Sequence, residues 1–246
     1  MNLDRVTITG ADDSVSIGRL HGLSKKFPFV EWGILYSKSQ IGGNRFPSET
    51  WFNDLHALAG EIKLSLHLCG SVVRDLLVGI NSMPLGLLPF LPKYQRIQLN
   101  FHAENAKCDP VYFYRALKDL RNEHQYIFQI DGSNGNEHME SVWAADVDAM
   151  LNCVPLFDIS GGAGILPNQW PKPEYMANDT DHIYHGYAGG LGPENLEQQL
   201  PLIAEAAGNT RIWIDMETKV RSNNDRQFDL DKVAACLEIC APFVTQ

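Results

Sequence analysis

The sequence predicts an α/β protein folded as a single (β/α)8 TIM barrel over residues 1–246, and three observations predict it. β-rich runs recur about every 30 residues, and helical patterns fill most of the gaps between them, which is typical of parallel βαβ units. Eight such units in 246 residues match the usual number of units and the usual length of a (β/α)8 barrel. The strands also alternate polar and apolar residues, whereas the central strands of an open doubly wound sheet are usually apolar throughout.

Each predicted strand is a short run rich in β-branched, aromatic or other apolar residues. The eight runs, in chain order, are Val6–Gly10, Val30–Ser37, Lys63–Cys69, Arg96–His102, Tyr126–Asp131, Val154–Ile159, Ile183–Ala188 and Ile212–Glu217. Helical patterns occupy the connections at Ser48–Gly60, Ser71–Ile80, Val111–His124, Glu137–Met150, Glu194–Ala207 and Phe228–Ile239. The connections after the first and sixth strands show no clear pattern.

Polar residues occupy alternate positions of these strands, so they should lie on one face. The face of a barrel strand that meets the helices must be apolar, and the polar face therefore borders the lumen. The polar positions are Thr7, Thr9, Ser65, His67, Cys69, Gln98, Asn100, His102, Gln129, Asp131, Asp158, Asp215 and Glu217. They gather toward the carboxyl ends of the strands, where barrel enzymes hold their active sites, so we expect a ligand or reaction site there.

The charge balance and the cysteines limit the class of protein. Thirty acidic residues stand against 20 Lys and Arg, a net charge of -10, which disfavours a nucleic-acid-binding surface because phosphate contacts need a basic face. The five cysteines form no C-x-x-C pair, which fits a reducing cytoplasm and indicates neither a disulfide framework nor structural zinc. The N-terminus has no apolar signal core, and no stretch is long enough to span a membrane. We therefore expect a cytoplasmic protein without cofactor, nucleic-acid partner or membrane partner.

Two glycine-rich stretches follow the sixth and seventh predicted strands, at Asp158–Gly164 and Gly189–Gly192. Glycines let backbone N–H groups approach an anion closely, and a following helix N-terminus adds a favourable dipole. Loops after the late strands often bind phosphate in barrels. Either stretch alone is also explained by an ordinary turn. Together they predict a phosphate site that includes Gly161, Gly162, Gly164, Gly189 and Gly190.

Several stretches, taken in chain order, form a recognisable set. They are Val6–Gly10, Gly33–Ser39, Ile97–Asn100, Leu156–Asp158 with Gly161–Gly164, Ala188–Asn195 and Ile212–Asp215. This set resembles phosphoribosylanthranilate isomerase, the TIM-barrel enzyme of tryptophan biosynthesis. The resemblance runs over nearly the whole chain and is most specific between strands six and eight. The chain is longer than is usual for that family, with extra residues around Asn81–Tyr94 and Pro171–Asp181.

That family carries out an Amadori rearrangement, in which a base removes a proton from the sugar and an acid protonates the ring oxygen as the ring opens. The resemblance places the general acid at Asp158. It places the family's catalytic cysteine at Thr9, and a hydroxyl group cannot accept a proton as a thiolate does. This departure leaves the general base unassigned.

Two further departures concern the groups that hold the family's substrate. The family has a small Ser-Ser-Gly turn after strand eight, whereas this chain has Glu217, which would repel phosphate if it pointed inward. Lys219 and Arg221 could restore some attraction. The family also uses an arginine after strand two to hold the anthranilate carboxylate, and Arg45 is the nearest candidate, several residues late.

The strand ends offer further candidates for acid–base chemistry. His67 and His102 could supply the missing base because imidazole titrates near neutral pH, and His67 is the first choice. Cys69 could replace the missing thiol from another wall of the barrel. Asp131 and Asp215 end strands five and eight. Each candidate has a structural alternative, which is a histidine bonded to backbone, a packed cysteine, or a carboxylate that stabilises a loop.

We expect an isomerase that acts on a phosphorylated, phosphoribosyl-like small molecule, with Asp158 as the acid. The catalytic candidates are Asp158, His67, Asp131 and Asp215, and the substrate-contacting candidates are Thr9, Arg45, His102, Glu217 and the five glycines. The alternatives are another reaction on the same barrel, such as a lyase, an aldolase-type enzyme or a metal-assisted hydrolase, or a non-catalytic barrel that binds a ligand or partner. No H-x-H or H-E-x-x-H spacing supports a metal.

Two apolar features have more than one interpretation. The extra stretch Asn81–Tyr94 is rich in apolar residues and could form an oligomer interface or a lid. Trp170, after strand six, could pack in the core or cover the pocket.

Overall fold

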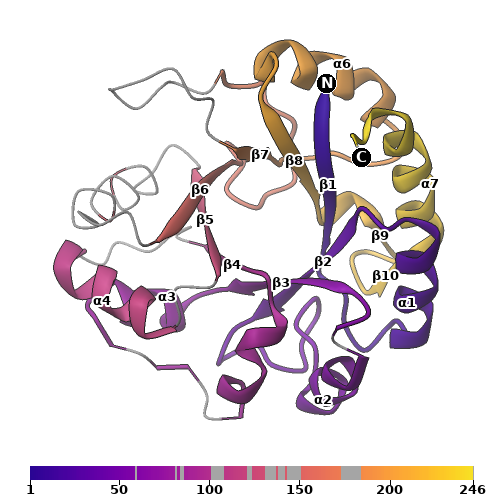
Figure 1. Ribbon diagram of the computed structural model, residues 1–246. Helices are drawn as coiled ribbons and strands as arrows, with labels where there is room; N and C mark the ends of the chain where they lie inside the picture. Colours follow the sequence, from indigo (N-terminus) through magenta and orange to yellow (C-terminus); the bar gives the residue numbers. More distant parts are fainter. Residues whose placement is uncertain are drawn as a thin grey trace.

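The computed structural model describes residues 1–58, 60–80, 82–83, 86–100, 108–120, 124–130, 137, 142, 151–172 and 184–245. Its eight main strands close into a barrel in chain order, and β8 returns to pair with β1 (Figure 1). Every neighbouring pair of barrel strands is parallel. The predicted (β/α)8 TIM barrel is therefore confirmed.

All eight barrel strands coincide with the predicted runs to within a few residues at each end. They are β1 (Asn2–Thr9), β2 (Val30–Tyr36), β3 (Lys63–Leu68), β4 (Arg96–Leu99), β5 (Gln125–Ile130), β6 (Asn152–Phe157), β7 (His185–Tyr187) and β8 (Arg211–Met216). The predicted fourth and fifth runs extended to His102 and Asp131, and both of these residues lie outside the described part of the chain.

Helices surround the barrel on its outer side (Figure 1). They are α1 (Ile17–Lys26), α2 (Glu49–Leu58), α3 (Ser71–Leu77), α4 (Pro110–Leu120), α6 (Leu196–Ala207) and α7 (Leu230–Cys240), with 3-10 helices η1 (Leu88–Lys93), η2 (Thr218–Val220) and η3 (Ala241–Phe243). The sequence showed no clear pattern for α1, in which Leu20 is the one fully buried side chain, so apolar periodicity is weak there. The helix predicted over 137–150 lies outside the described residues, apart from Glu137 and Val142.

Side-chain caps define where two of these helices begin. Asp109 Oδ1 accepts the backbone N–H groups of Val111 and Tyr112, and Pro110 occupies the first position of α4. Asp229 accepts two backbone N–H groups in the same way at the start of α7. Such caps satisfy donors that have no partner within the helix, and proline loses nothing at a position whose N–H is unpaired.

The main hydrophobic core lies between the barrel wall and the helices. Strand residues that alternate with the polar set, such as Val6, Ile8, Leu64 and Leu66, are fully buried in it. This is the arrangement that the alternation predicted. Inside the lumen the later strands supply a second, smaller apolar cluster, which consists of Ile127, Val154, Leu156, Ala188 and Trp213.

The extra stretch before β4 packs against this core. Met83, Leu87 and Leu91 are buried, with 6%, 6% and 3% of their surface exposed. Buried side chains cannot contact another molecule, so these three do not form the oligomer interface considered from the sequence. Trp170 is also buried, and its Nε1 donates to Gln199 Oε1 at 2.9 Å, so it packs within the protein and does not cover the pocket.

A small antiparallel hairpin, β9 (Arg221–Ser222) with β10 (Gln227–Phe228), lies between β8 and α7 and was not predicted. The two ends of the chain meet, because the backbone N–H of Thr245 donates to Leu3 O at 2.9 Å. No helix in the described part of the chain is long and apolar enough to cross a membrane.

Candidate active site at the barrel mouth

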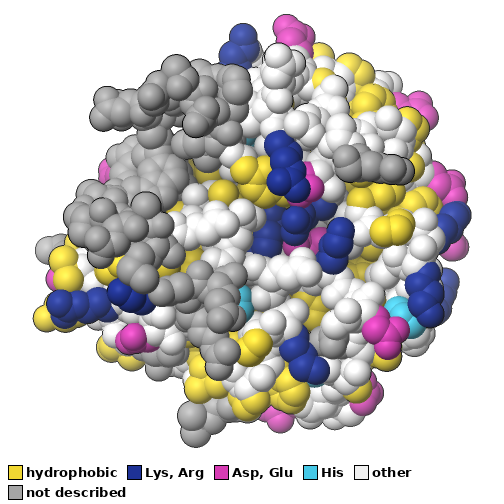
Figure 2. All heavy atoms as spheres, viewed as in Figure 1, with side chains coloured by type: hydrophobic (Ala, Val, Ile, Leu, Met, Phe, Trp, Pro, Cys, Tyr) yellow, Lys and Arg dark blue, Asp and Glu magenta, His cyan; other side chains and the backbone are white. Residues whose placement is uncertain are grey.

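A cavity of about 490 Å³ opens at the carboxyl ends of the barrel strands, where the sequence predicted a site. Charged side chains of both signs gather at the centre of this face (Figure 2). The predicted residues that line the cavity are Arg45, His67, Cys69, Gln98, Asn100, Gln129, Asp158, Asp215, Glu217, Gly161, Gly162, Gly164, Gly189 and Gly190. His102 and Asp131 lie outside the described residues.

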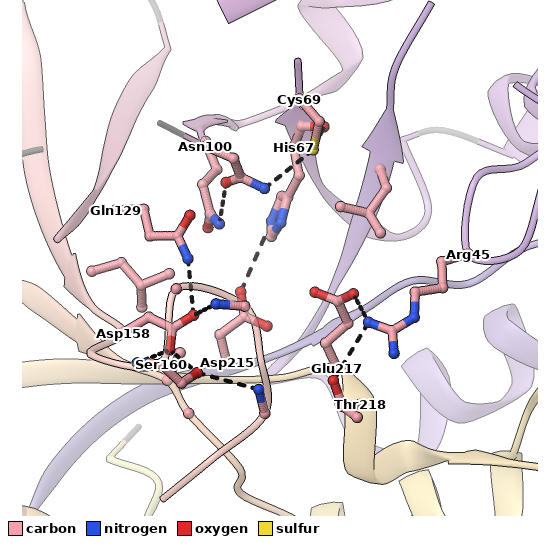
Figure 3. Close-up of a pocket in the computed structure, with 18 of the residues that line it drawn as sticks. Arg45, His67, Cys69, Asn100, Gln129, Asp158, Ser160, Asp215, Glu217 and Thr218 are labelled. Carbon is pink, nitrogen blue, oxygen red and sulfur yellow. Dashed lines mark hydrogen bonds and ion pairs between the residues drawn. The ribbon is translucent and has the colours of Figure 1, made fainter. Parts of the chain in front are cut away.

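Asp215 and His67 face each other on the floor of this cavity, from β8 and β3 (Figure 3). His67 Nε2 lies 4.0 Å from Asp215 Oδ2. Thr9, at the end of β1, donates its hydroxyl to Asp215 Oδ1 at 2.7 Å. Gly33 leaves room for this contact, because a Cβ there would lie 2.2 Å from Thr9 Oγ1. Thr9, where the resemblance places a catalytic cysteine, thus positions the carboxyl group of Asp215.

Burial changes the protonation of both groups. Asp215 is 6% exposed, and desolvation raises its pKa well above the ordinary value despite the hydrogen bond from Thr9, while the nearby Glu217 carboxylate raises it further. Desolvation lowers the pKa of His67 to about 3. His67 Nε2 has no hydrogen-bond partner among the described residues. Burial therefore disfavours the charged form of each partner, the carboxylate of Asp215 and the imidazolium of His67.

A buried ion pair lies inside the barrel on the same face of the strands. Glu31 on β2 accepts Arg96 Nε from β4 at 3.0 Å and Arg5 Nη1 from β1 at 3.0 Å. Burial acts to raise the pKa of Glu31, but the two guanidinium groups hold it below its ordinary value. The guanidinium of Arg96 also lies 4.3 Å from the centroid of the Trp213 ring. These contacts connect β1, β2, β4 and β8 across the lumen.

Asp158 is held by four hydrogen bonds at the end of β6 (Figure 3). Its Oδ2 accepts Gln129 Nε2 at 2.9 Å and the backbone N–H of Gly162 at 2.8 Å. Its Oδ1 accepts Ser160 Oγ at 2.6 Å and the Ser160 N–H at 3.2 Å. Four donors match the acceptor capacity of a carboxylate, so the residue organises the loop after β6. Its role as a general acid stays a prediction.

The backbone donors of this loop are used internally. The N–H of Gly161 donates to Asp158 O at 2.9 Å, and the N–H of Gly164 donates to Ser160 Oγ at 3.2 Å. Together with the bond from Gly162 to Asp158, these contacts occupy the donors that were expected to hold phosphate. In this structure, therefore, the three glycines shape the wall of the cavity.

The two glycine loops pack closely against each other. A Cβ on Gly190 would lie 2.6 Å from Leu166 N, and one on Gly189 would lie 3.1 Å from Ile165 O. Gly189 and Gly190 also adopt φ angles of 116° and 65°. Both the close approach and the positive φ require glycine at these two positions.

The loop after β7 lines the cavity and has unused backbone donors. Gly189, Gly190 and Leu191 are buried and line the cavity, and within the described part of the chain their N–H groups donate no hydrogen bond. Buried N–H groups without a partner are rare in folded proteins. Successive N–H groups in a turn can form a concave seat for an anion. Of the five glycines predicted to hold phosphate, Gly189 and Gly190 are therefore the two whose donors stay unused, and phosphate binding there stays a prediction.

Arg45 extends into the cavity beside Glu217 (Figure 3), and two carboxylates bind it. Its Nη1 donates to Glu217 Oε1 at 2.5 Å, and its Nε donates to Asp225 Oδ2 at 2.7 Å. Its backbone has a φ of 70°, and its N–H donates to Asp12 Oδ2 at 2.9 Å. Arg221 also donates to Asp12 Oδ2, at 2.7 Å. Glu217 thus points inward, and Arg45 offsets part of its charge.

Cys69 lies just after β3 with its thiol protonated. Burial raises the pKa of this thiol to about 12, and Asn100 Nδ2 donates to Sγ at 3.2 Å. A thiol with this pKa carries almost no thiolate near neutral pH, so it does not replace the family's catalytic cysteine. Among the described residues, no group of three or more His, Cys, Asp or Glu side chains is arranged to hold a metal ion.

Several residues that shape the site were not predicted. Glu31 and Arg96 lie two positions before Gly33 and Gln98, on the same face of their strands. The alternation rule could have found them if it had been followed toward the amino ends of the strands. Asp225 belongs to the unpredicted hairpin loop, and no sequence pattern indicates that it meets Arg45.

The eight-stranded parallel barrel and the polar cavity at its mouth define the class of protein, a TIM barrel with the layout of barrel enzymes. Among solved structures, phosphoribosylanthranilate isomerase from Thermus thermophilus matches 97% of this chain and 99% of its own, with a TM-score of 0.60 and 18% identity. The Thermotoga maritima phosphoribosylanthranilate isomerase matches 98% of this chain and 100% of its own, with a TM-score of 0.54 and 11% identity.

A truncated 3-deoxy-D-arabino-heptulosonate 7-phosphate synthase from Thermotoga maritima is also similar, with a TM-score of 0.58 and 10% identity over 98% of this chain and 86% of its own. No protein-family model and no curated protein sequence matches the chain. The chain therefore has a phosphoribosylanthranilate isomerase-like TIM-barrel fold. Since one fold serves different reactions, the reaction has to be argued from the site.

Proposed function

We propose that this barrel is an acid–base enzyme of the isomerase type that acts on a phosphorylated small molecule held at its mouth. The observation that carries the proposal is the buried pair of Asp215 and His67, whose Oδ2 and Nε2 atoms lie 4.0 Å apart on the cavity floor. An isomerase that moves hydrogen within its substrate needs one group that accepts a proton and one that donates a proton. Burial raises the pKa of Asp215, which favours its role as the donor, and it leaves the imidazole of His67 neutral, as an acceptor must be, although the lowered pKa makes His67 a weak base.

The proton transfers can be written with these two side chains. His67 Nε2 accepts a proton from a substrate carbon that carries a hydroxyl group and lies beside a carbonyl group, while Asp215 gives its proton to the carbonyl oxygen, which forms an enediol. The other hydroxyl of the enediol then returns a proton to Asp215, and His67 returns its proton to the adjacent carbon. The substrate is rearranged without net gain or loss of atoms. The Thr9 hydrogen bond at 2.7 Å fixes Oδ1 of Asp215 during these steps.

The loop after β7 supports the phosphate half of the proposal. Gly189, Gly190 and Leu191 line the cavity, and their N–H groups have no acceptor among the described residues. A phosphate group supplies several strong acceptor oxygens, and buried N–H groups favour such a partner. Asp158, which the resemblance makes the acid, is the second candidate for that role, although its oxygens already accept four hydrogen bonds.

Exchange of substrate C–H hydrogen with solvent tests the proposal. Purified protein would be incubated in D2O with a panel of aldose and ketose phosphates and with phosphoribosylanthranilate, and ¹H NMR would follow the C–H signals. We expect deuterium to enter at least one phosphorylated compound. Asp215→Asn and His67→Gln should each slow this entry at least about 100-fold, because both remove a proton-transfer group.

Two further variants make the outcome specific. Asp54→Asn, on the exposed side of α2, is the matched control and should exchange at the wild-type rate. Asp158→Asn separates the two candidate acids, since loss of exchange in this variant alone would assign the acid to Asp158. The absence of exchange with every phosphorylated compound would contradict the proposed activity.

A further inference from the structure

Glu217 extends into the cavity beside Asp215. Thr9, which donates to Asp215 Oδ1 at 2.7 Å, is followed by Gly10, and a Cβ on Gly10 would lie 3.5 Å from Glu217 Cγ. The side chains of Asp215 and Glu217 therefore both lie at the end of β1. Burial raises the pKa of the Cys69 thiol, just after β3, and the charge of Glu217 raises it further, so this carboxylate acts across the cavity.

Arg45 holds one oxygen of the Glu217 carboxyl group and leaves the other open. Arg45 Nη1 donates to Glu217 Oε1 at 2.5 Å, and Oε2 accepts no hydrogen bond from the residues that the structure describes. Figure 3 shows one oxygen facing Arg45 and the other pointing away from it. The Glu217 side chain is 28% exposed, against 6% for Asp215, so a ligand in the cavity can contact Oε2.

Asp215 by itself has one oxygen left for the substrate. Its Oδ1 accepts the Thr9 hydroxyl at 2.7 Å, and its Oδ2 faces His67 Nε2 at 4.0 Å. The proposed isomerisation moves protons at two substrate oxygens, because the carbonyl oxygen gains a proton and the neighbouring hydroxyl group loses one. An acceptor beside Asp215 would serve that hydroxyl group, and Glu217 Oε2 is open for it.

We propose that Glu217 is a further catalytic residue of this site, whose Oε2 accepts the proton of the second substrate hydroxyl group and passes it to Asp215. The inference rests on the proposed function, in which that hydroxyl group returns a proton to Asp215, and it supplies the path. Asp215 protonates the carbonyl oxygen and is left as a carboxylate. Glu217 takes the hydroxyl proton while His67 returns its proton to the adjacent carbon. Transfer of the proton from Glu217 to Asp215 then restores the starting state, with no net gain or loss of protons.

The surroundings of the two carboxyl groups favour this direction of transfer. Burial raises the pKa of Glu217, the Arg45 guanidinium opposes that rise, and the Asp158 and Asp225 carboxylates add to it. Asp215 forms no ion pair with a Lys or Arg of the described chain, and burial raises its pKa well above the ordinary value. The Arg45 contact thus favours the charged form at Glu217, and burial favours the protonated form at Asp215. Carboxyl groups with such different surroundings commonly divide the acid and base roles.

Hydrogen exchange and product formation, measured together, test this inference. The aldose and ketose phosphates of the panel, such as ribose 5-phosphate, would be incubated with the protein in D2O. ¹H NMR would follow both the loss of the substrate C–H signal and the appearance of the isomer. Exchange into the substrate requires Asp215 and His67 but not Glu217, because the enediol can return to the starting compound. Conversion into the isomer also requires the transfer of the hydroxyl proton.

Glu217→Gln should therefore separate the two rates. We expect C–H exchange to stay within about threefold of the wild-type rate and conversion to fall at least about 100-fold, the usual contribution of one proton-transfer group. Glutamine keeps an oxygen that can accept from Arg45, so this contact is preserved. Glu197→Gln, on the exposed side of α6, is the matched control and should change neither rate.

Added formate gives a second measurement that a purely structural role would not affect. Glu217→Ala should also exchange hydrogen but convert slowly, and its conversion should rise with formate concentration, because formate supplies a carboxylate in the vacated space. Chloride at the same ionic strength should have no such effect.

The outcomes separate the two proposals. Conversion by Glu217→Gln near the wild-type rate, an equal loss of exchange and conversion, or a Glu217→Ala variant that formate leaves unchanged would each overturn the role of Glu217. Wild-type exchange without conversion would overturn it too, because no hydroxyl proton would then be transferred. The absence of wild-type exchange with every phosphorylated compound would instead contradict the proposed function, and this inference with it.

Discussion

At the level of single residues, desolvation decides which groups in the cavity can exchange protons. Asp215 receives a hydrogen bond from Thr9, which alone would stabilise the carboxylate, yet burial outweighs it and raises the pKa. His67 loses its positive charge for the same reason. Asp158, which directly follows β6, instead receives four hydrogen bonds. Two aspartates at one barrel mouth thus have different surroundings, which favours different roles.

Replacement of His67 by glutamine should make the protein less sensitive to acid. The unfolded chain protonates this side chain below its ordinary pKa of 6.5, whereas the folded imidazole stays neutral down to about 3. His67 should therefore contribute a fall in wild-type stability of about 1.4 kcal/mol for each unit by which the pH is lowered across that window, and His67→Gln should remove this contribution. Urea unfolding at several pH values measures it.

The matched control for this prediction is His21→Gln on helix α1, which should leave the slope in place. A slope in His67→Gln equal to that of the wild type would mean that the folded protein protonates His67 as readily as the unfolded chain does.

Sequence reasoning at this scale could identify side chains but not their partners. Alternation along the strands placed His67, Asp215 and Glu217 in the lumen, and they line the cavity. It could not show that Thr9 would bond to Asp215, because their contact depends on barrel closure between β1 and β8. It also could not show that Arg45 would be occupied, since its partner Asp225 is 180 residues away.

At the level of elements, the lumen is filled by pairing small residues with large ones. Trp213 on β8 is fully buried inside the barrel, and Gly186 on the neighbouring strand β7 lies beside it. A Cβ on Gly186 would lie 2.2 Å from the indole ring, which is closer than two carbon atoms can approach. Glycine at this strand position therefore makes room for tryptophan below the cavity.

Gly186→Ala should destabilise the protein by about 1–3 kcal/mol, because the added methyl group forces Trp213 or the strand to move. Chemical denaturation measures the change in the free energy of unfolding. Gly22→Ala in helix α1 is the control, since a Cβ there meets nothing within 4 Å and alanine favours a helix. The control should gain about 0.5–1 kcal/mol. Equal effects of the two substitutions would contradict the close packing described for β7 and β8.

Elements with strong patterns were predictable and elements with weak patterns were not. The strands and the amphipathic helix α4 follow clear apolar periodicities. Helix α1 carries two glycines and a single fully buried residue, so its pattern was too weak to interpret. The β9–β10 hairpin consists of two-residue strands, which are too short to show alternation.

At the level of the whole molecule, the barrel interior divides into a polar and an apolar half. Strands β1, β2 and β4 supply the network of Arg5, Glu31 and Arg96, whereas β5, β6 and β8 supply the apolar lumen cluster. Burying these charges costs desolvation free energy, which the attraction between them must offset. The attraction is large enough only while all the partners are present. The closed barrel holds these partners together from strands far apart in sequence.

Glu31→Gln should therefore lower the free energy of unfolding by about 3–5 kcal/mol, because it leaves the buried Arg96 guanidinium without its counter-charge and removes one of the two carboxylates that hold Arg5. Calorimetry should show the melting temperature falling by roughly 6–20 °C for a chain of this size. Glu238→Gln breaks the exposed ion pair with Lys26 and should cost less than about 1 kcal/mol. A loss from Glu31→Gln no larger than that of this surface control would show that the lumen network is not needed for stability.

The fold could be predicted as a whole, but the reaction could not. The regular spacing of strands and helices is a property of the entire chain. It predicts the barrel even though the sequence is only 18% and 10% identical to the solved barrels. The same architecture is found in an isomerase and in a synthase, so it does not specify chemistry. The reaction depends on a few side chains and on their solvation, which become visible only in three dimensions.

The protonation state of Asp215 tests the account most directly. Side-chain ¹³C NMR of the aspartate carboxyl groups, followed from acidic to mildly basic pH, would report its titration, and the signal is assigned by its loss in Asp215→Asn. The account predicts a carboxyl group that titrates well above its ordinary value of 3.8, so that it holds a proton for transfer to substrate. Titration of Asp215 near 3.8 would contradict its role as the acid of this site.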